Sequence, residues 1–294
     1  MGRLVLVATP IGNLGDLSPR AVDALSNADV IVCEDTRHSG RLLKHAGIAH
    51  KTLLVANDHT EASCSVRVVE LLDGGATVAV ITDAGTPGIS DPGERLVAAA
   101  VAAGHDVSVI PGPVAAIAAL VVSGLATERF VMEGFLPRSG RERRDRLIDV
   151  ARETRTVILY EAPHRLARTL NDLAEACGAD RRVVIGRELT KLHEEVWRGT
   201  LGDACERAAG RDPLGEHVVM LAGAPPPEPP SDALVNDAVG SALAAGASPR
   251  DAAAAVAAAL GVPRRQAYDI AIAHPDRPAR RTRRESVPPI DGSR

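Results

Sequence analysis

The chain has 294 residues, 45% of them hydrophobic and 24% charged, enough to bury the cores of one large domain or two to three smaller ones. Its net charge of −4 argues against a protein that coats nucleic acid over its whole surface, so any RNA contact must come from local basic patches. Aromatic residues make up only 2%, so the core must consist mainly of Ala, Val, Leu and Ile.

In the N-terminal part, short apolar runs alternate with helix-like segments. Crossovers of this length predict a mainly parallel sheet, and runs without polar alternation indicate that both of its faces are covered. The predicted strands are Leu4–Ala8, Val30–Cys33, Thr52–Val55, Val78–Ile81 and Val107–Ile110. The predicted helices are one that starts at Ser18-Pro19, Ser39–Ala46, one from Thr60 to near Gly74, and Arg95–Ala103.

The segment Pro111-Gly112-Pro113 interrupts regular secondary structure, so we predict that the first domain, residues 1–113, ends there. Residues 114–224 are predicted to form a second α/β domain with a mixed sheet. Its predicted helices are Val114–Val122, Arg141–Glu153, His164–Cys177 and Gly202–Ala209. Its predicted strands are Phe130–Glu133, Thr156–Tyr160, Arg182–Gly186, Glu195–Gly199 and His217–Leu221.

The C-terminal part changes in composition. Residues 225–230 read as a stiff Pro-rich linker, and residues 231–275 as a small domain with helices at Asp232–Ala245, Ser248–Leu260 and Arg264–Ala273. Residues 276–294 are rich in Arg and Pro and are predicted to be a disordered basic tail. The expected fold is therefore α/β, with two α/β domains and a small C-terminal helical appendage.

The cysteines lie far apart and form no C-x-x-C pair, which argues against structural zinc. The motif H-E-x-x-H is absent too, so we expect no metal site. No apolar run approaches the ~18 residues that a membrane span needs, and the run Leu4–Ala8 is too short for a signal peptide. We therefore expect a cytoplasmic protein without a membrane partner.

The most informative stretch is Val78–Gly93, VAVITDAGTPGISDPG, which predicts a buried strand, an irregular loop and then a helix. Ligands of open α/β sheets bind at the carboxyl ends of strands, where this loop lies. Gly85 and Gly88 let the backbone approach a ligand closely, and Asp83 can accept hydrogen bonds from an amine or a ribose hydroxyl. The alternative is an ordinary tight turn with Pro92 at a helix start.

Two other loops follow predicted strands at the same edge. The loop ATPIGN, residues 8–13, matches neither the dinucleotide-binding pattern G-x-G-x-x-G nor the P-loop pattern. In the loop EDTRH, residues 34–38, Asp35 could serve equally as a helix N-cap or in catalysis. Arg37 could hold a phosphate bidentately.

Four stretches in order carry a family resemblance. ITDAGTPGISDPG is similar to the central signature of the tetrapyrrole-methylase superfamily, which uses S-adenosylmethionine (SAM). LVATPIGNLGDLSPRA, CEDTRHSGRLL and VIPGPVAAIAALVVSGL resemble its branch of small-subunit ribosomal RNA methyltransferases. The similarity covers roughly residues 3–223 and, more weakly, 248–273. It implies domains of tetrapyrrole-methylase type, methylation of a cytidine ribose 2′-hydroxyl in 16S rRNA, and a homodimer.

The resemblance also implies site residues. The residues expected to contact SAM are Pro10, Asp83, Ala84, Gly85, Thr86, Val114, Ala115, Tyr160, Leu221 and Ala222. The segment FLPRSGRERRDR, residues 135–146, carries five arginines, about half of which a solvated helix face with internal ion pairs would explain. Its loop Pro137–Gly140 is predicted to be a basic flap that contacts phosphates. The residues expected to contact RNA are Arg37, Arg138, Arg141, Arg144, Arg165 and Arg187.

Methyl transfer from a sulfonium mainly requires alignment of the acceptor oxygen, the methyl group and the sulfur. A ribose hydroxyl is a weak nucleophile, so removal of its proton could help. The candidates for the group that removes it are Asp35, Glu161, Glu188 and Lys191, with Glu34 and His164 also at strand ends, and the sequence does not choose among them.

Two other functions remain open. One is methylation of a tetrapyrrole intermediate, although those relatives typically carry a glycine-rich turn after the first strand, where this chain has ATPIGN. The other is a non-catalytic RNA-binding module in which the C-terminal helices act as a helix-turn-helix. Polar residues at strand ends in both halves argue against the second, because a binding module needs no such cleft.

Overall fold

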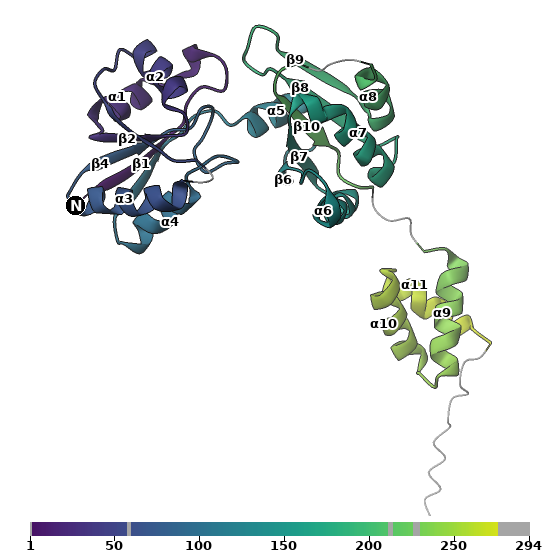
Figure 1. Cartoon of the computed structure of the whole chain (residues 1–294). Coiled ribbons are helices and arrows are strands. Elements are labelled where there is room, and N and C mark those ends of the chain that lie inside the picture. Colours follow the sequence, from purple (N-terminus) through teal and green to yellow (C-terminus); the bar gives the residue numbers. More distant parts are fainter. Residues whose placement is uncertain (1, 58–59, 211–213, 226–229, 276–294) are drawn as a thin grey trace, which may run out of the picture. The chain divides into compact units, whose positions relative to one another are not determined.

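The computed structural model describes residues 2–57, 60–210, 214–225 and 230–275. By its internal contacts the chain divides into two units, Met1–Pro225 and Pro226–Arg294 (Figure 1). Both predicted sheets fall in the first unit, so the division predicted after residue 113 stays a prediction. The predicted tail, 276–294, and most of the predicted linker lie outside the described residues.

The N-terminal sheet is parallel throughout its described pairings, as the sequence predicts, with strand order β3-β2-β4-β1-β5. Each strand begins and ends within a residue of its predicted bounds, because short apolar runs between turn signals define buried strands well. The strands are β1 (Arg3–Val7), β2 (Val30–Cys33), β3 (Thr52–Val55), β4 (Thr77–Val80) and β5 (Asp106–Ile110).

Helices cover both faces of this sheet (Figure 1). Alternate residues of β4 show the division, since Ala79 packs into the core with α1 and α2, whereas Val78 and Val80 pack into the core with α3 and α4. Helix α2 begins at Thr36 rather than at the predicted Ser39, because Asp35 is its N-cap. The helices are α1 (Pro19–Asn27), α2 (Thr36–His45), α3 (Glu61–Asp73) and α4 (Glu94–Ala102).

The second sheet is mixed, as predicted, with strand order β6-β7-β10-β8-β9. β6 is parallel to β7, and β10 lies antiparallel between β7 and β8. Helix α5 packs on one face, and α6, α7 and α8 contribute to the core on the other. The elements are α5 (Ala115–Ser123), β6 (Phe130–Phe135), α6 (Gly140–Arg152), β7 (Thr156–Glu161), α7 (Pro163–Cys177), β8 (Arg182–Arg187), β9 (Glu195–Thr200), α8 (Leu201–Ala208) and β10 (His217–Leu221).

The second unit is helical over its described residues, with α9 (Asp232–Ala244), α10 (Pro249–Leu260) and α11 (Arg264–Ala273). Its own core contains Val235, Val239 and Val256. The Ser248 hydroxyl accepts a hydrogen bond from the N–H of Asp251 at the start of α10, and Gly261 ends that helix in the left-handed conformation. In the part of the chain that the structure describes, no helix is long and apolar enough to cross a membrane.

Candidate functional site

A cavity of about 310 Å³ is lined by loops of the first sheet and by residues of the second. The loop after β4 contributes one wall, and the start of α5 and the ends of β7, β8 and β10 contribute the others. Of the ten residues expected to contact SAM, those that line this cavity are Ala84, Gly85, Thr86, Val114, Ala115 and Tyr160. We call it the cofactor cavity below.

Backbone hydrogen bonds hold the loops of this cavity together. Thr9 and Gly85 form an isolated antiparallel bridge, with Thr9 N to Gly85 O at 2.8 Å and Gly85 N to Thr9 O at 3.1 Å. The Thr86 hydroxyl donates to the carbonyl of Pro113 at 3.2 Å. Gly85 has φ +88°, and a Cβ there would lie 3.4 Å from Ile11 Cγ2. The loop therefore keeps an open backbone surface that a larger residue would fill.

Tyr160 forms part of the apolar wall. Its ring lies 5.6 Å from that of Phe135, centroid to centroid, and both rings line the cavity. Its hydroxyl accepts a hydrogen bond from the N–H of Ala116 at 3.1 Å. Burial raises the pKa of Tyr160, so the phenol stays neutral at physiological pH.

The other four predicted cofactor residues lie elsewhere. Pro10 and Asp83 line a neighbouring cavity, described next. Leu221 and Ala222 line neither cavity, since β10 runs antiparallel to its neighbours and its last residue pairs with Val157 and Val183 at the far edge of the sheet. The first two residues of β10, His217 and Val218, are the ones that line the cofactor cavity. No contact in the structure supports an assignment of Leu221 and Ala222 to SAM, and that assignment stays a prediction.

The second cavity measures about 500 Å³ and adjoins the cofactor cavity. Three residues line both: Ile11, Ala84 and Glu216. The second cavity is also lined by Asp83 after β4, by His38 and Arg41 of α2 and by Lys191 after β8. Asp83 Oδ1 is buried and has no hydrogen-bond partner among the described residues. His38 belongs to the loop EDTRH that the sequence places at this edge, whereas Arg41 and Glu216 are not among the predicted site residues. The position of Arg41 one helical turn after Arg37 was the available signal.

Lys191 is held between two carboxylates. Its Nζ lies 2.9 Å from Glu188 Oε1 and 2.9 Å from Glu216 Oε2. Although burial favours the neutral amine, the hydrogen bonds to Glu188 and Glu216 raise the pKa of Lys191, and the bond from Lys191 lowers the pKa of Glu188. Lys191 is therefore a fixed cation, and a cation cannot remove a proton.

The backbone beside the Glu188–Lys191 pair adopts unusual conformations and carries glycines at its closest approaches. Glu188 and Thr190 have positive φ angles of 50° and 67°, which non-glycine residues rarely adopt outside constrained sites. A Cβ on Gly12 would lie 2.4 Å from Lys191 Cγ, and one on Gly215 would lie 2.4 Å from Glu188 Cγ. Both glycines thus leave room for the Glu188–Lys191 pair.

Asp35 acts as a helix cap. Its Oδ1 accepts a hydrogen bond from the backbone N–H of Arg37 at 2.7 Å, and its Oδ2 pairs with the Arg37 guanidinium at 2.9 Å. The hydrogen bonds from Arg37 lower the pKa of Asp35 to about 2, which makes this carboxylate a weak base.

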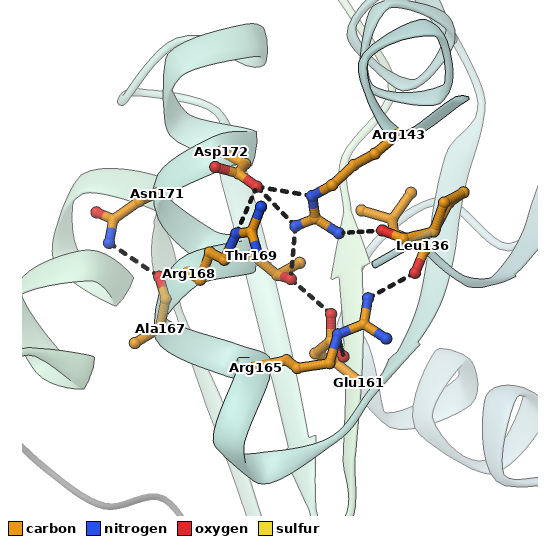
Figure 2. Close-up of polar contacts among 10 residues, drawn as sticks. Leu136, Arg143, Glu161, Arg165, Ala167, Arg168, Thr169, Asn171 and Asp172 are labelled. Atoms are coloured by element: carbon orange, nitrogen blue, oxygen red, sulfur yellow. Dashed lines mark hydrogen bonds and ion pairs between the residues drawn. The ribbon is translucent and has the colours of Figure 1, made fainter. Parts of the chain in front are cut away.

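Glu161 lies in a polar network on the α7 face of the second sheet (Figure 2). Successive residues of a strand point to opposite faces, so Tyr160 faces the cofactor cavity and the Glu161 carboxylate faces α7. Glu161 Oε2 accepts a hydrogen bond from the Thr169 hydroxyl at 2.5 Å, and its Oε1 lies 3.2 Å from Arg165 Nε. Both oxygens are engaged, although the residue borders the cofactor cavity.

Arg143 extends the same network (Figure 2). Its guanidinium pairs with Asp172 at 2.7 Å and donates to the Thr169 hydroxyl at 3.0 Å and to the carbonyl of Pro137 at 2.8 Å. Its side chain is only 4% exposed. The network therefore anchors the loop that connects β6 to α6, at the start of the predicted basic flap.

The predicted RNA-contacting arginines fall into two groups. Arg37, Arg138, Arg141 and Arg144 are exposed, although Arg37 pairs with Asp35 and Arg141 pairs with Asp145 at 3.4 Å. Arg165 and Arg187 are half-buried and engaged, Arg165 with Glu161 and the carbonyl of Leu136, and Arg187 with Glu195 at 3.9 Å. The geometry leaves the first group available to an anion and holds the second on the protein.

Metal-binding side chains do not gather in this site. Over the described residues, no group of three or more His, Cys, Asp or Glu side chains could hold a metal ion.

Comparison with known proteins agrees with this architecture. A family model described as Tetrapyrrole (Corrin/Porphyrin) Methylases matches residues 3–205, and one described as the RsmI C-terminal HTH domain matches residues 231–274. The solved structure of the methyltransferase CobJ has a TM-score of 0.58 and 23% identity and covers 76% of this chain and 95% of its own. That of a diphthine synthase has a TM-score of 0.58 and 16% identity and covers 76% of this chain and 90% of its own. These two likenesses concern the fold alone.

Sequence relatives are much nearer. The protein named ribosomal RNA small subunit methyltransferase I from Synechocystis sp. is 47% identical over 274 residues, which is 92% of this chain and 98% of that protein. The protein of the same name from Mycobacterium tuberculosis (strain CDC 1551 / Oshkosh) is 47% identical over 91% of this chain and 94% of its own. The chain therefore belongs to the tetrapyrrole methylase family, in the group of methyltransferases that carry the name ribosomal RNA small subunit methyltransferase I.

Proposed function

We propose that this protein transfers a methyl group from SAM to the ribose 2′-hydroxyl of a cytidine in the 16S rRNA of the small ribosomal subunit. The relatives whose names refer to small-subunit ribosomal RNA support the substrate class. The observation that carries the proposal is the pair of adjoining cavities, one with the Tyr160 and Phe135 rings in its wall, the other lined by Asp83, Arg41 and Lys191. The cytoplasm, where ribosomal subunits assemble, is the proposed place of action.

The cofactor cavity fits SAM. Its volume of about 310 Å³ lies within the range of small-ligand sites, and the open backbone at Gly85 gives a flat ligand close approach. Residues 84–86 and 114–115 would hold the cofactor through backbone groups, while Tyr160 and Phe135 would cover an apolar part of it. SAM supplies a methyl group that its positive sulfur already activates. The chain then has to bind, orient and shield the two reactants.

Methyl transfer to purified small subunits that lack the modification is the direct test. With labelled SAM, the label should appear in 16S rRNA and map to the 2′-oxygen of one cytidine. Titration calorimetry should show SAM binding by the protein alone. If SAM binds but no label enters the RNA, the substrate assignment is wrong.

The alternative acceptor, a tetrapyrrole intermediate, is tested in the same assay. Uroporphyrinogen offered in place of the subunits should accept no label. Label on the tetrapyrrole and none on the RNA would reverse the two assignments.

We also propose that the protein is a homodimer. Helix α5 exposes apolar side chains, with Val121 68%, Val122 44% and Ile117 42% exposed, and a self-complementary contact would bury them. Light scattering at micromolar concentration should give twice the chain mass, and Val121→Asp should give the monomer. A monomer mass for the unmodified protein would refute this proposal.

A further inference from the structure

We propose that the 500 Å³ cavity binds the acceptor ribonucleotide and that Asp83 is the catalytic residue that receives the proton of its 2′-hydroxyl. This inference rests on the proposed function and assigns roles within it. It also moves Asp83 from the cofactor, where the sequence analysis placed it, to the acceptor.

The first support is position. Asp83 lines the second cavity, and Ala84, the next residue, lines both cavities. A methyl donor in the cofactor cavity and an acceptor in the second cavity would therefore meet at the turn that these two residues form. That is where a group acting on the acceptor hydroxyl has to lie, since a general base must reach the proton that it removes.

The second support is an unsatisfied acceptor. Asp83 Oδ1 is buried without a hydrogen-bond partner among the described residues. A buried carboxylate oxygen is normally hydrogen-bonded, because leaving it unpaired costs free energy. A ribose hydroxyl is a donor of the right kind, and Asp83 lines the cavity in which it would lie.

The third support is the set of basic side chains at the wall of this cavity. Arg41 and His38 lie on α2, and neither side chain has a polar partner within the described part of the chain. Lys191 also lines the cavity, but it is already paired with Glu188 and Glu216. Arg41 can therefore bind a phosphate of a nucleotide whose ribose hydroxyl donates to the Asp83 carboxylate.

The fourth support is the state of the other candidates. Asp35 caps α2 and pairs with Arg37. Glu161 has both oxygens engaged on the α7 face, and Glu188 pairs with Lys191. Unlike these three carboxylates, Asp83 has a buried oxygen without a partner among the described residues.

The proposed methyl transfer forms one bond, breaks one bond and releases one proton. The 2′-oxygen forms a bond to the methyl carbon while the carbon–sulfur bond breaks, and the electron pair of that bond stays on sulfur, which becomes a neutral thioether. The hydroxyl proton passes to the Asp83 carboxylate and from there to solvent. Arg41 binds phosphate and takes no part in the proton transfer.

Substitutions should separate these roles. Asp83→Asn keeps the shape of the side chain but cannot take a proton, so kcat on small subunits should fall by about 10²-fold or more. Its SAM affinity by calorimetry should stay within about threefold of the unmodified protein. Arg41→Gln should raise KM for the subunits and leave kcat nearly unchanged. Asp106→Asn, which replaces an exposed carboxylate on β5, is the matched control and should change neither constant.

A second measurement needs no variant and no methyl donor. The unmodified protein should bind cytidine 5′-monophosphate more tightly than its 2′-deoxy analogue, and Asp83→Asn should reduce that difference. Equal affinity for the two nucleotides in the unmodified protein would overturn the ribose assignment even if Asp83→Asn fails to fold.

Three outcomes would change the assignment of Asp83 or of the RNA substrate. If Asp83→Asn loses SAM affinity, Asp83 belongs to the cofactor site. If it keeps its kcat while Asp35→Asn or Glu188→Gln loses it, the proton goes elsewhere. If the unmodified protein discriminates between the two nucleotides but never methylates small subunits, the proposed RNA substrate fails and the cavity assignment stands.

Discussion

The hydroxyl of Tyr160 accepts a hydrogen bond of 3.1 Å from the backbone N–H of Ala116. Ala116 lies in the first turn of α5, and the N-cap of that helix, Val114, has no side-chain oxygen to offer. The Tyr160 hydroxyl, on β7, thus satisfies an N–H at the start of α5 that a serine or threonine N-cap satisfies in other helices. The same bond fixes the Tyr160 ring at the wall of the cofactor cavity.

Tyr160→Phe should therefore lower stability and weaken SAM binding together. The variant leaves the N–H of Ala116 without its partner, which should cost about 1–2 kcal/mol of unfolding free energy. Urea unfolding and calorimetry with SAM measure the two effects. Tyr268→Phe, in the helical unit, is the control and should leave SAM affinity unchanged. An equal loss of SAM affinity in both variants would contradict the assignment of Tyr160 to the cofactor cavity.

Gly85→Val should abolish SAM binding. The residue has φ +88°, and its Cβ would project toward Ile11 and Pro113 at the cavity. The same conformation makes any side chain there strained, so a loss could reflect strain alone. Gly75→Val supplies the control, because Gly75 has φ +86° with open space around it. Similar melting temperatures with SAM binding lost only at position 85 is the expected result, and wild-type SAM affinity at position 85 would refute it.

Removal of charge at Arg138, Arg141 and Arg144 should weaken RNA binding and flatten its dependence on salt. Each lost phosphate contact should lower the slope of log K against log salt by about one. Binding to small subunits at several salt concentrations gives this slope. Arg20→Gln, which removes an exposed charge on α1, is the control. An unchanged slope in the triple variant would leave these arginines as a solvated helix face.

Arg143, in the middle of the same basic segment, should behave differently. Arg143→Met removes the buried partner of the Asp172 carboxylate and one hydrogen bond to the Thr169 hydroxyl, which should cost about 3 kcal/mol of stability. Arg141→Met breaks the exposed pair with Asp145 and should cost less than about 0.5 kcal/mol. Chemical denaturation of the two variants is the measurement. Equal stabilities would show that the network of Figure 2 does not anchor the loop.

The Glu188–Lys191 pair should make stability depend on pH. The pKa of Glu188 is lowered by Lys191, so its contribution is present above the unfolded value of about 4.3 and is lost as pH falls through the folded pKa. The pKa of Lys191 is raised, so its contribution is lost only above about pH 10.4. Lys191→Met should therefore flatten the acid side of a melting-temperature profile. Arg67→Met, which breaks an exposed pair with Glu70, should leave that profile unchanged, and a matching loss in both variants would contradict the prediction.

The sequence predicts the strands, the helices and the loop of residues 82–93 well, because these depend on local apolar runs and turn residues. It says less where distant pairing decides. Nothing local to residues 217–222 shows that β10 inserts antiparallel between β7 and β8. This pairing places Leu221 and Ala222 outside both cavities, and their assignment to SAM stays a prediction. Likewise, the pairing of Lys191 with Glu216 joins residues that only the folded sheet brings together.

Arg143 is a case in which a signal was present. It shares a helical face with Leu147 and Val150, both buried, whereas Arg141 and Arg144 lie off that face. The phase of the helix thus distinguishes the structural arginine from its neighbours. The nature of its partners, Asp172 and Thr169 on α7, could come only from the packing of α6 against α7.

The direction of β10 also determines how the chain leaves its first unit. After Leu221 the backbone stays pinned at the far edge, with Ala222 N bound to Arg182 O and Ala224 N bound to Glu153 O. Gly223 passes so close to Thr154 that a Cβ would lie 1.8 Å from its carbonyl oxygen. The chain thus leaves this unit at the edge of the second sheet that lines neither cavity. A gene fusion after residue 224 can therefore replace the C-terminal segment with another domain and leave unchanged every strand end that lines a cavity. This position is suited to recombination and to protein engineering.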